Sequence, residues 1–184
     1  MPEPKSRDFA PPWRVPVTVE EVAESGQHFD LIADAPVRAA VAKAVGLRDL
    51  PRLEASFDVT RRGSGGLQVT GSISATVGQN CVVTLEPLAN EVEETIDLIF
   101  EPPELVPKTA AHPEGKRHSV DWNDPEPLIG GGVDLGALAI EFLILGLDPY
   151  PRKPGAAFET PQDVSPDQGP FAALGRLAKR QEGH

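Results

Sequence analysis

The segment from Val133 to Gly155 constrains the fold of this chain most, because a short apolar stretch runs directly into three prolines. Asp134 is placed to cap a helix by accepting hydrogen bonds from the free amides of its first turn. The apolar residues that follow recur at the spacing of one helical face: Leu135, Leu138, Phe142 and Leu145. Prolines remove backbone donors and favour extended conformations before them, so the buried helix ends and a stiff segment follows.

The residues after this helix form what we call the proline segment, residues 148–155 with the sequence Asp-Pro-Tyr-Pro-Arg-Lys-Pro-Gly. It carries one aromatic ring, Tyr150, and two cations, Arg152 and Lys153. An aromatic ring can stack on an unpaired base while adjacent cations contact phosphates, so the segment is a candidate RNA-binding element. The same residues also suit a stiff turn whose tyrosine covers the core, and the sequence leaves both interpretations open.

Alternating apolar residues predict an antiparallel sheet in the middle of the chain. Residues 53–59 and 67–77 have this alternation and are joined by a glycine-rich turn, which is typical of a hairpin. A second turn at 78–80 and a short strand at 81–85 are expected next, followed by a fourth strand at 92–100. The short connections make these strands antiparallel, with one face on the core and helices on that side only. Alternation alone fits both an open sheet and a strongly curled, barrel-like one.

Shorter elements are expected before the hairpin. Valines alternate with other residues over 15–19, where Pro16 indicates an edge strand, and residues 29–31 are a second extended piece. Asp34 can cap a helix that Gly46 can end. The predicted fold class is therefore α+β, with an antiparallel sheet and two helices packed on the core.

The composition along the chain predicts a single α+β domain over residues 13–155. We expect a mobile N-terminus at 1–12 and a flexible acidic loop at about 102–132, since the loop lacks a periodic apolar face. Residues 156–184 are predicted to be a linker and an amphipathic, basic C-terminal tail. The cations of this tail that we consider for RNA or partner binding are Arg176, Lys179 and Arg180.

The formal net charge of −11 argues against general nucleic-acid binding and against a DNA-binding role, because such binding requires an excess of cations. A local basic patch can still act by itself, since charges are screened beyond about 8 Å at physiological salt. Glu91, Glu93 and Asp97 should share one face of a strand, because alternate side chains point to the same side. They indicate either a solvated face or a docking site for a basic partner.

Four parts of the chain, taken in order, resemble the bacterial YceD family, the large ribosomal RNA accumulation proteins. Many members of that family have Cys-x-x-Cys where this chain has Cys81 and Thr84, so a metal or redox role of that pair is not expected here. The matching parts are Cys-Val-Val-Thr-Leu-Glu-Pro at 81–87, Asp-Leu at 134–135 with Glu141, Asp-Pro-Tyr-Pro at 148–151, and Gly-Pro-Phe-Ala-Ala-Leu at 169–174.

The resemblance implies a non-catalytic factor for large ribosomal subunit biogenesis that promotes accumulation of 23S rRNA. Its expected partners are 23S rRNA or a large-subunit precursor, together with a basic ribosomal protein. The opposite charges of the acidic strand and of the late basic residues favour binding to both. The alternative is a protein-only adaptor or chaperone for a basic ribosomal protein, without RNA contact.

The residues that catalysis or metal binding would require do not form a recognisable set, so we predict no enzymatic activity, no cofactor and no metal site. The single cysteine, Cys81, excludes an internal disulfide. The histidines are scattered, whereas a zinc site needs about four convergent ligands. Glu141 lies in an otherwise apolar helix and must face solvent or meet a donor, and its role stays open.

The chain lacks a stretch near the roughly 20 apolar residues of a membrane-spanning helix. Its first residues also lack a hydrophobic signal core. We therefore expect a cytoplasmic protein that does not bind membranes.

Overall fold

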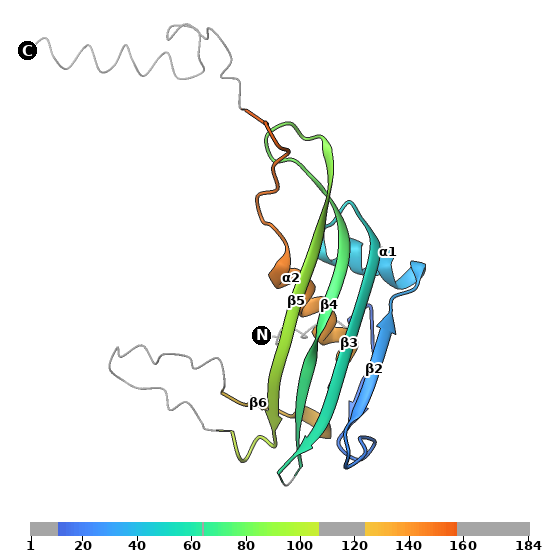
Figure 1. Ribbon diagram of the computed structural model, residues 1–184, viewed down its shortest axis with the longest axis vertical. Coiled ribbons are helices and arrows are strands. Elements are labelled where there is room, and N and C mark those ends of the chain that lie inside the picture. The colour runs from blue at the N-terminus through green and yellow to red at the C-terminus, as the bar shows by residue number, and fades with distance from the viewer. Residues whose placement is uncertain (1–10, 64, 107–123, 158–184) are drawn as a thin grey trace, which may run out of the picture.

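A computed structural model describes residues 11–63, 65–106 and 124–157. They form an α+β fold with a five-stranded sheet in the order β2-β3-β4-β5-β6 and a separate two-stranded sheet, β1-β7. Both helices lie on the same side of the large sheet, as predicted, and none of the described elements covers the other side (Figure 1). The elements are β1 Pro16–Thr18, β2 Gln27–Ile32, α1 Ala35–Val45, β3 Asp49–Arg62, β4 Gly66–Asn80, β5 Pro87–Glu101, β6 Glu126–Pro127, the 3-10 helix η1 Ile129–Gly131, β7 Gly132–Asp134 and α2 Leu135–Gly146.

The large sheet is open, so the strongly curled or barrel-like alternative is not the form that the described residues adopt. Its four longer strands are antiparallel neighbours, and β6 pairs in parallel with the end of β5. The two edges are β2 and β6, which do not pair with each other. Apolar alternation could not make this distinction, because it reports only which face of each strand is buried.

The prediction of a turn at 78–80 and a strand at 81–85 is wrong. The strand β4 continues to Asn80, residues 81–86 make the turn, and β5 begins at Pro87. The amide of Cys81 donates to the carbonyl of Glu86 at 2.9 Å, which closes this turn. Gly78 lies within β4, where the side chain of Asp49 approaches so closely that a Cβ would collide with it. Gly78 therefore lies at the close approach of a side chain and not in a turn.

Both helix starts agree with the sequence prediction. Asp34 accepts a hydrogen bond from the amide of Val37 at 2.9 Å and caps α1, which Gly46 ends with a φ of 76°. Asp134 accepts from the amides of Gly136 and Ala137 at 3.1 and 3.2 Å and caps α2.

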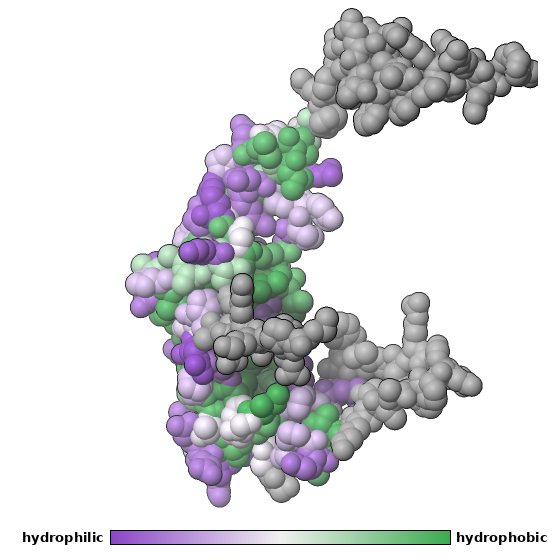
Figure 2. All heavy atoms as spheres, turned by 180° about the vertical axis from the view of Figure 1, so that it is seen from behind, coloured by the Kyte–Doolittle hydropathy of each residue, from purple (hydrophilic) through white to green (hydrophobic). Residues whose placement is uncertain are grey.

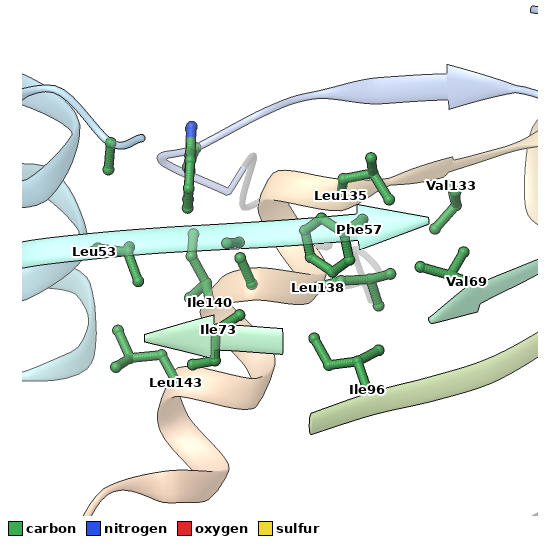
Figure 3. Packing of buried hydrophobic residues seen from close by; sticks show 14 of the residues in the cluster. Leu53, Phe57, Val69, Ile73, Ile96, Val133, Leu135, Leu138, Ile140 and Leu143 are labelled. Carbon is green, nitrogen blue, oxygen red and sulfur yellow. The ribbon is translucent and has the colours of Figure 1, made fainter. Parts of the chain in front are cut away.

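The core fills the space between the sheet and α2 (Figure 3). Phe57 of β3, Ile73 of β4 and Ile96 of β5 supply sheet side chains that are at least 98% buried. The buried face of α2 is rotated from the predicted one, since Leu145 is 70% exposed. Its buried residues are Leu135, Gly136, Leu138, Ala139, Ile140 and Leu143.

Part of the region predicted to be a flexible loop at 102–132 is ordered against the sheet. Glu126 pairs with Phe100 in the β5–β6 ladder, and Leu128 is buried in the core. Apolar periodicity could not indicate these contacts, because two paired residues and one buried leucine are too short a pattern. The rest of this loop, at 107–123, lies outside the described residues, as do most of the predicted N-terminus and tail.

None of the described helices is both long enough and apolar enough to cross a membrane.

Candidate functional site

The open side of the large sheet carries many carboxylates around a central strand of small hydroxyl residues. The strand registers place His28, Asp58, Thr70 and Asp97 side by side across the sheet. We call this surface the acidic sheet face. Its carboxylates belong to Asp30, Glu54, Asp58, Glu91, Glu93 and Asp97, and its central hydroxyls to Thr70, Ser72, Ser74 and Thr76. A shallow depression of about 410 Å³ lies on it between β2, β3 and β4.

The three acids proposed from the sequence share this face, but they differ in their contacts. Glu91 accepts hydrogen bonds from Thr76 and from Arg52, both at 2.8 Å. These two donors, Thr76 more than Arg52, hold the pKa of Glu91 below its usual value. Asp97 accepts from the amide of Gln68 at 3.1 Å, whereas Glu93 is exposed and makes no ion pair within the described residues. Glu93 and Asp97 are therefore more available to a cationic partner than Glu91.

A histidine that is isolated in the sequence lies among carboxylates on the same face. His28 Nδ1 is 2.8 Å from Asp58 Oδ1, and its Nε2 is 3.1 Å from Asp30 Oδ1. These hydrogen bonds, that to Asp58 first, raise the pKa of His28 above its usual value. Sequence reasoning missed the cluster because the β2–β3 register brings together residues that are 30 positions apart.

The proline segment is docked on the β4–β5 turn, not held away from the domain. The amide of Val82 donates to the carbonyl of Pro151 at 2.9 Å, and Gln79 donates to the carbonyl of Asp148 at 2.9 Å. Pro151 is buried, but the ring of Tyr150 is 71% exposed. Tyr150 therefore does not cover the core, which removes the packing role considered for it from the sequence.

The two cations of the proline segment have different surroundings. Lys153 Nζ forms an ion pair with Glu86 Oε2 at 2.9 Å, and this contact is the largest cause that lowers the pKa of Glu86. Arg152 is exposed and forms no ion pair with any residue that the structure describes. Among the described residues, Arg152 is thus the cation of this segment that has no carboxylate partner. The predicted tail residues Arg176, Lys179 and Arg180 lie outside the described residues.

Cys81 lies where the turn and the proline segment meet. Its buried sulfur accepts hydrogen bonds from the amides of Lys153 at 3.4 Å and Thr84 at 3.5 Å. These donors, with the Lys153 amide contributing most, lower the pKa of the Cys81 thiol to about 6. Within the described ranges no group of three or more His, Cys, Asp or Glu residues is placed to hold a metal ion.

Glu141 is exposed on the outer side of α2, so its carboxylate meets solvent and needs no buried donor.

Hydrophobic residues gather on the helix side of the molecule, over α2 and at the end of the sheet that carries the β4–β5 turn (Figure 2).

A basic depression beside α1 was not predicted. It has a volume of about 560 Å³ and is lined by α1 and by residues 47–51, and we call it the α1 hollow. Its cations are Arg38, Lys43 and Arg48. A sequence signal exists, because residues 35–48 contain these cations and no acid in a chain whose net charge is −11.

The fold and these surfaces define an α+β protein with an open acidic sheet and separate, smaller basic surfaces. A family model described as "Large ribosomal RNA subunit accumulation protein YceD" matches residues 69–177. The chain therefore belongs to the YceD family, which confirms the resemblance seen in its motifs. No curated protein and no solved structure matches the chain.

Proposed function

We propose that this protein is a non-catalytic factor for large ribosomal subunit biogenesis that promotes accumulation of 23S rRNA in the cytoplasm. The observation that carries the proposal is the YceD match over residues 69–177, whose description names large ribosomal RNA subunit accumulation. The match includes most of β4, all of β5 and α2, and the proline segment. The match thus includes the proline segment and the β4 and β5 parts of the acidic sheet face, whereas β2, β3 and the α1 hollow lie before it.

The acidic sheet face is the surface that would receive a basic ribosomal protein. Its carboxylates are solvated, with the side chains of Asp30 and Asp58 74% and 67% exposed. The hydroxyl side chains of β4 are shorter than the acids on β3 and β5, so the acids flank a lower central strip. Complementary charge of this kind steers association and suppresses wrong partners. Glu93 and Asp97 are its most accessible acids among the three first proposed.

Contact with rRNA in the proline segment would use Tyr150 and Arg152, since Lys153 is already paired. Exposure of the ring supports stacking on an unpaired base. The tail cations Arg176, Lys179 and Arg180 would add phosphate contacts.

The second candidate function is a protein-only adaptor that holds a basic ribosomal protein without touching RNA. Pairing of Lys153 with Glu86 favours it, because this removes one cation from the proposed RNA contact. The net charge of −11 also favours a basic protein over a polyanion.

In-cell crosslinking through the full chain, followed by identification of the attached RNA and protein, tests both candidates. The first predicts 23S rRNA fragments and a basic ribosomal protein, and the adaptor predicts only the protein, retained after nuclease treatment. Both candidate functions would be contradicted if neither RNA nor a ribosomal protein is attached and if cells lacking the protein have a normal ratio of 23S rRNA to small-subunit rRNA.

The role of the acidic sheet face is tested by expressing variants of the full chain in cells that lack the protein. Glu93→Gln with Asp97→Asn removes two charges from the acidic sheet face and should reduce partner capture and 23S rRNA accumulation. Glu20→Gln with Glu24→Gln is the matched control, because both are exposed acids between β1 and β2 and do not belong to this face. Equal rescue by the two double variants would argue against docking on the sheet.

A further inference from the structure

The α1 hollow combines positive charge with an uncovered, partly apolar floor. One wall is α1 and the other is residues 47–51, which are the end of the connection and the first residues of β3. None of its lining residues belongs to the acidic sheet face or to the proline segment. Its volume of about 560 Å³ lies within the range of about 300–1,000 Å³ that is usual for ligand sites. The hollow is therefore a separate surface with room for part of a polymeric ligand.

The cations of the hollow are incompletely neutralised by the residues that the structure describes. Arg48 Nε contacts Asp49 Oδ2 at 2.8 Å, and Asp49 is the only acid among the lining residues. Lys43 is exposed and has neither an ion pair nor a side-chain hydrogen bond with any residue in the described ranges. Arg38 donates one N–H to the carbonyl of Ala33 at 2.6 Å. That bond fixes its guanidinium while leaving further donors for a ligand.

The rest of the lining is small and apolar. It consists of Ala35, Ala39, Ala42, Leu47, Leu50 and Pro51. The short side chains of Ala35 and Ala39 are exposed and allow a ligand to approach the helix backbone, and Leu47 and Pro51 offer apolar contact to a sugar or a base. Guanidinium groups match phosphate oxygens with two parallel hydrogen bonds, and an ammonium adds a point charge. Repeated negative charge joined by less polar groups is the chemistry that this lining fits.

We propose that the α1 hollow binds a phosphodiester segment of large-subunit rRNA, with Arg38, Lys43 and Arg48 contacting phosphates. The inference rests on the proposed function and assigns the RNA contact to a surface outside the proline segment. It would also let a chain with a net charge of −11 contact RNA through residues that do not belong to the acidic sheet face.

Binding of the full-length protein to transcribed 23S rRNA fragments, measured by fluorescence anisotropy over a salt series, tests the inference. The hollow variant is Lys43→Gln with Arg48→Gln. The control is Arg14→Gln with Arg62→Gln, which removes the same charge from exposed arginines outside the hollow. We expect the affinity of the hollow variant for RNA to fall about tenfold, and the slope of its log affinity against log salt concentration to become shallower by about 1 to 2. Both changes should be much smaller in the control. Equal losses in both variants would overturn the proposal, and equal thermal melting would show that both remain folded.

Competition identifies the ligand. Unlabelled 23S rRNA fragment, inorganic phosphate, a nucleoside monophosphate and a polyglutamate peptide are each added to the complex with labelled RNA. Displacement only by RNA supports the proposal. Efficient displacement by phosphate or by the monophosphate would instead assign a small-anion site, and displacement by the peptide would assign a site for acidic proteins, so either result overturns it.

Failure of this inference can be told apart from failure of the proposed function. If the hollow variant binds RNA normally while cells lacking the protein still accumulate less 23S rRNA, only the assignment of the hollow fails. If those cells accumulate normal 23S rRNA, the proposed function fails whatever the binding assay gives.

Discussion

The ammonium of Lys153 lies 2.9 Å from the carboxylate of Glu86, which joins the proline segment to the β4–β5 turn across 67 positions of sequence. The amides of Val82 and Lys153 reinforce the same junction through Pro151 and Cys81. The segment after α2 is thus held by contacts with the far end of the sheet, in addition to the stiffness of its prolines.

Replacing Lys153 by Gln should raise the pKa of Glu86 toward its usual value, since Lys153 is the main cause of its lowering. A lowered carboxyl pKa stabilises the fold above the unfolded pKa, and this contribution is lost as the pH falls through the folded value. The variant should therefore have a lower melting temperature than the unchanged protein at neutral pH. In acid, the two melting temperatures should be the same. Arg152→Gln is the control, and an equal effect of the two variants would contradict the pairing.

Removing the cap of α2 should cost more than removing the cap of α1. Asp134 accepts from two helix amides and also from the amide of Val15 at 2.8 Å, whereas Asp34 accepts from one helix amide. We expect Asp134→Ala to lower the free energy of unfolding by about 1–2 kcal/mol and Asp34→Ala by about 0.5–1 kcal/mol. Urea unfolding measures both, and the reverse order would contradict the role given to Asp134.

The Cys81 thiol should titrate at about pH 6, well below the usual thiol pKa of about 8.5. The ultraviolet absorbance of the thiolate, with Cys81→Ser as the blank, reports this titration directly because the chain has one cysteine. The lowered pKa also means that the stabilisation from the amide donors is lost as the pH falls through 6. A midpoint near the usual value would show that the donors do not act on the sulfur.

The His28 ring should titrate above the usual histidine pKa of about 6.5, because Asp58 and Asp30 stabilise its charged form. Its contribution to stability is complete below that usual value and is lost as the pH rises through the raised pKa. NMR titration should show a larger fall in the midpoint for Asp58→Asn than for Asp30→Asn. His28→Gln assigns the signal, and an unchanged midpoint in Asp58→Asn would contradict the contact.

Two leucines of α2 allow the effect of side-chain burial on stability to be distinguished from the effect of helix propensity. Leu143 is fully buried against the sheet, whereas Leu145 is 70% exposed on the same helix. We expect Leu143→Ala to cost about 2–5 kcal/mol and Leu145→Ala no more than about 0.5 kcal/mol. Equal losses in chemical unfolding would mean that the helix packs through another face.

Local patterns in the sequence predicted the parts of the fold that depend on neighbouring residues. The 53–59 and 67–77 hairpin followed from alternation, and the start of each helix followed from Asp34 and Asp134. Gly78 was wrongly predicted to lie in a turn, because the sequence does not distinguish a glycine in a turn from one beside a closely approaching side chain.

The contacts of the candidate surfaces were harder to predict, because they join distant residues. Pairing of Lys153 with Glu86 and of His28 with Asp58 depends on docking and on register, which composition does not contain. Charge patterning did place Glu91, Glu93 and Asp97 on one face, but it missed the partners that occupy Glu91.

The position of β3 has a practical consequence for choosing fragments to express. The family match begins at Val69, within β4, so a fragment cut at its limits would lack β3 and the buried side chains of Leu53 and Phe57. Its β4 would then be an unpaired edge strand without the packing of β3 beside it, a state that favours aggregation. Recombinant versions should therefore begin before Trp13, whose side chain also belongs to the core.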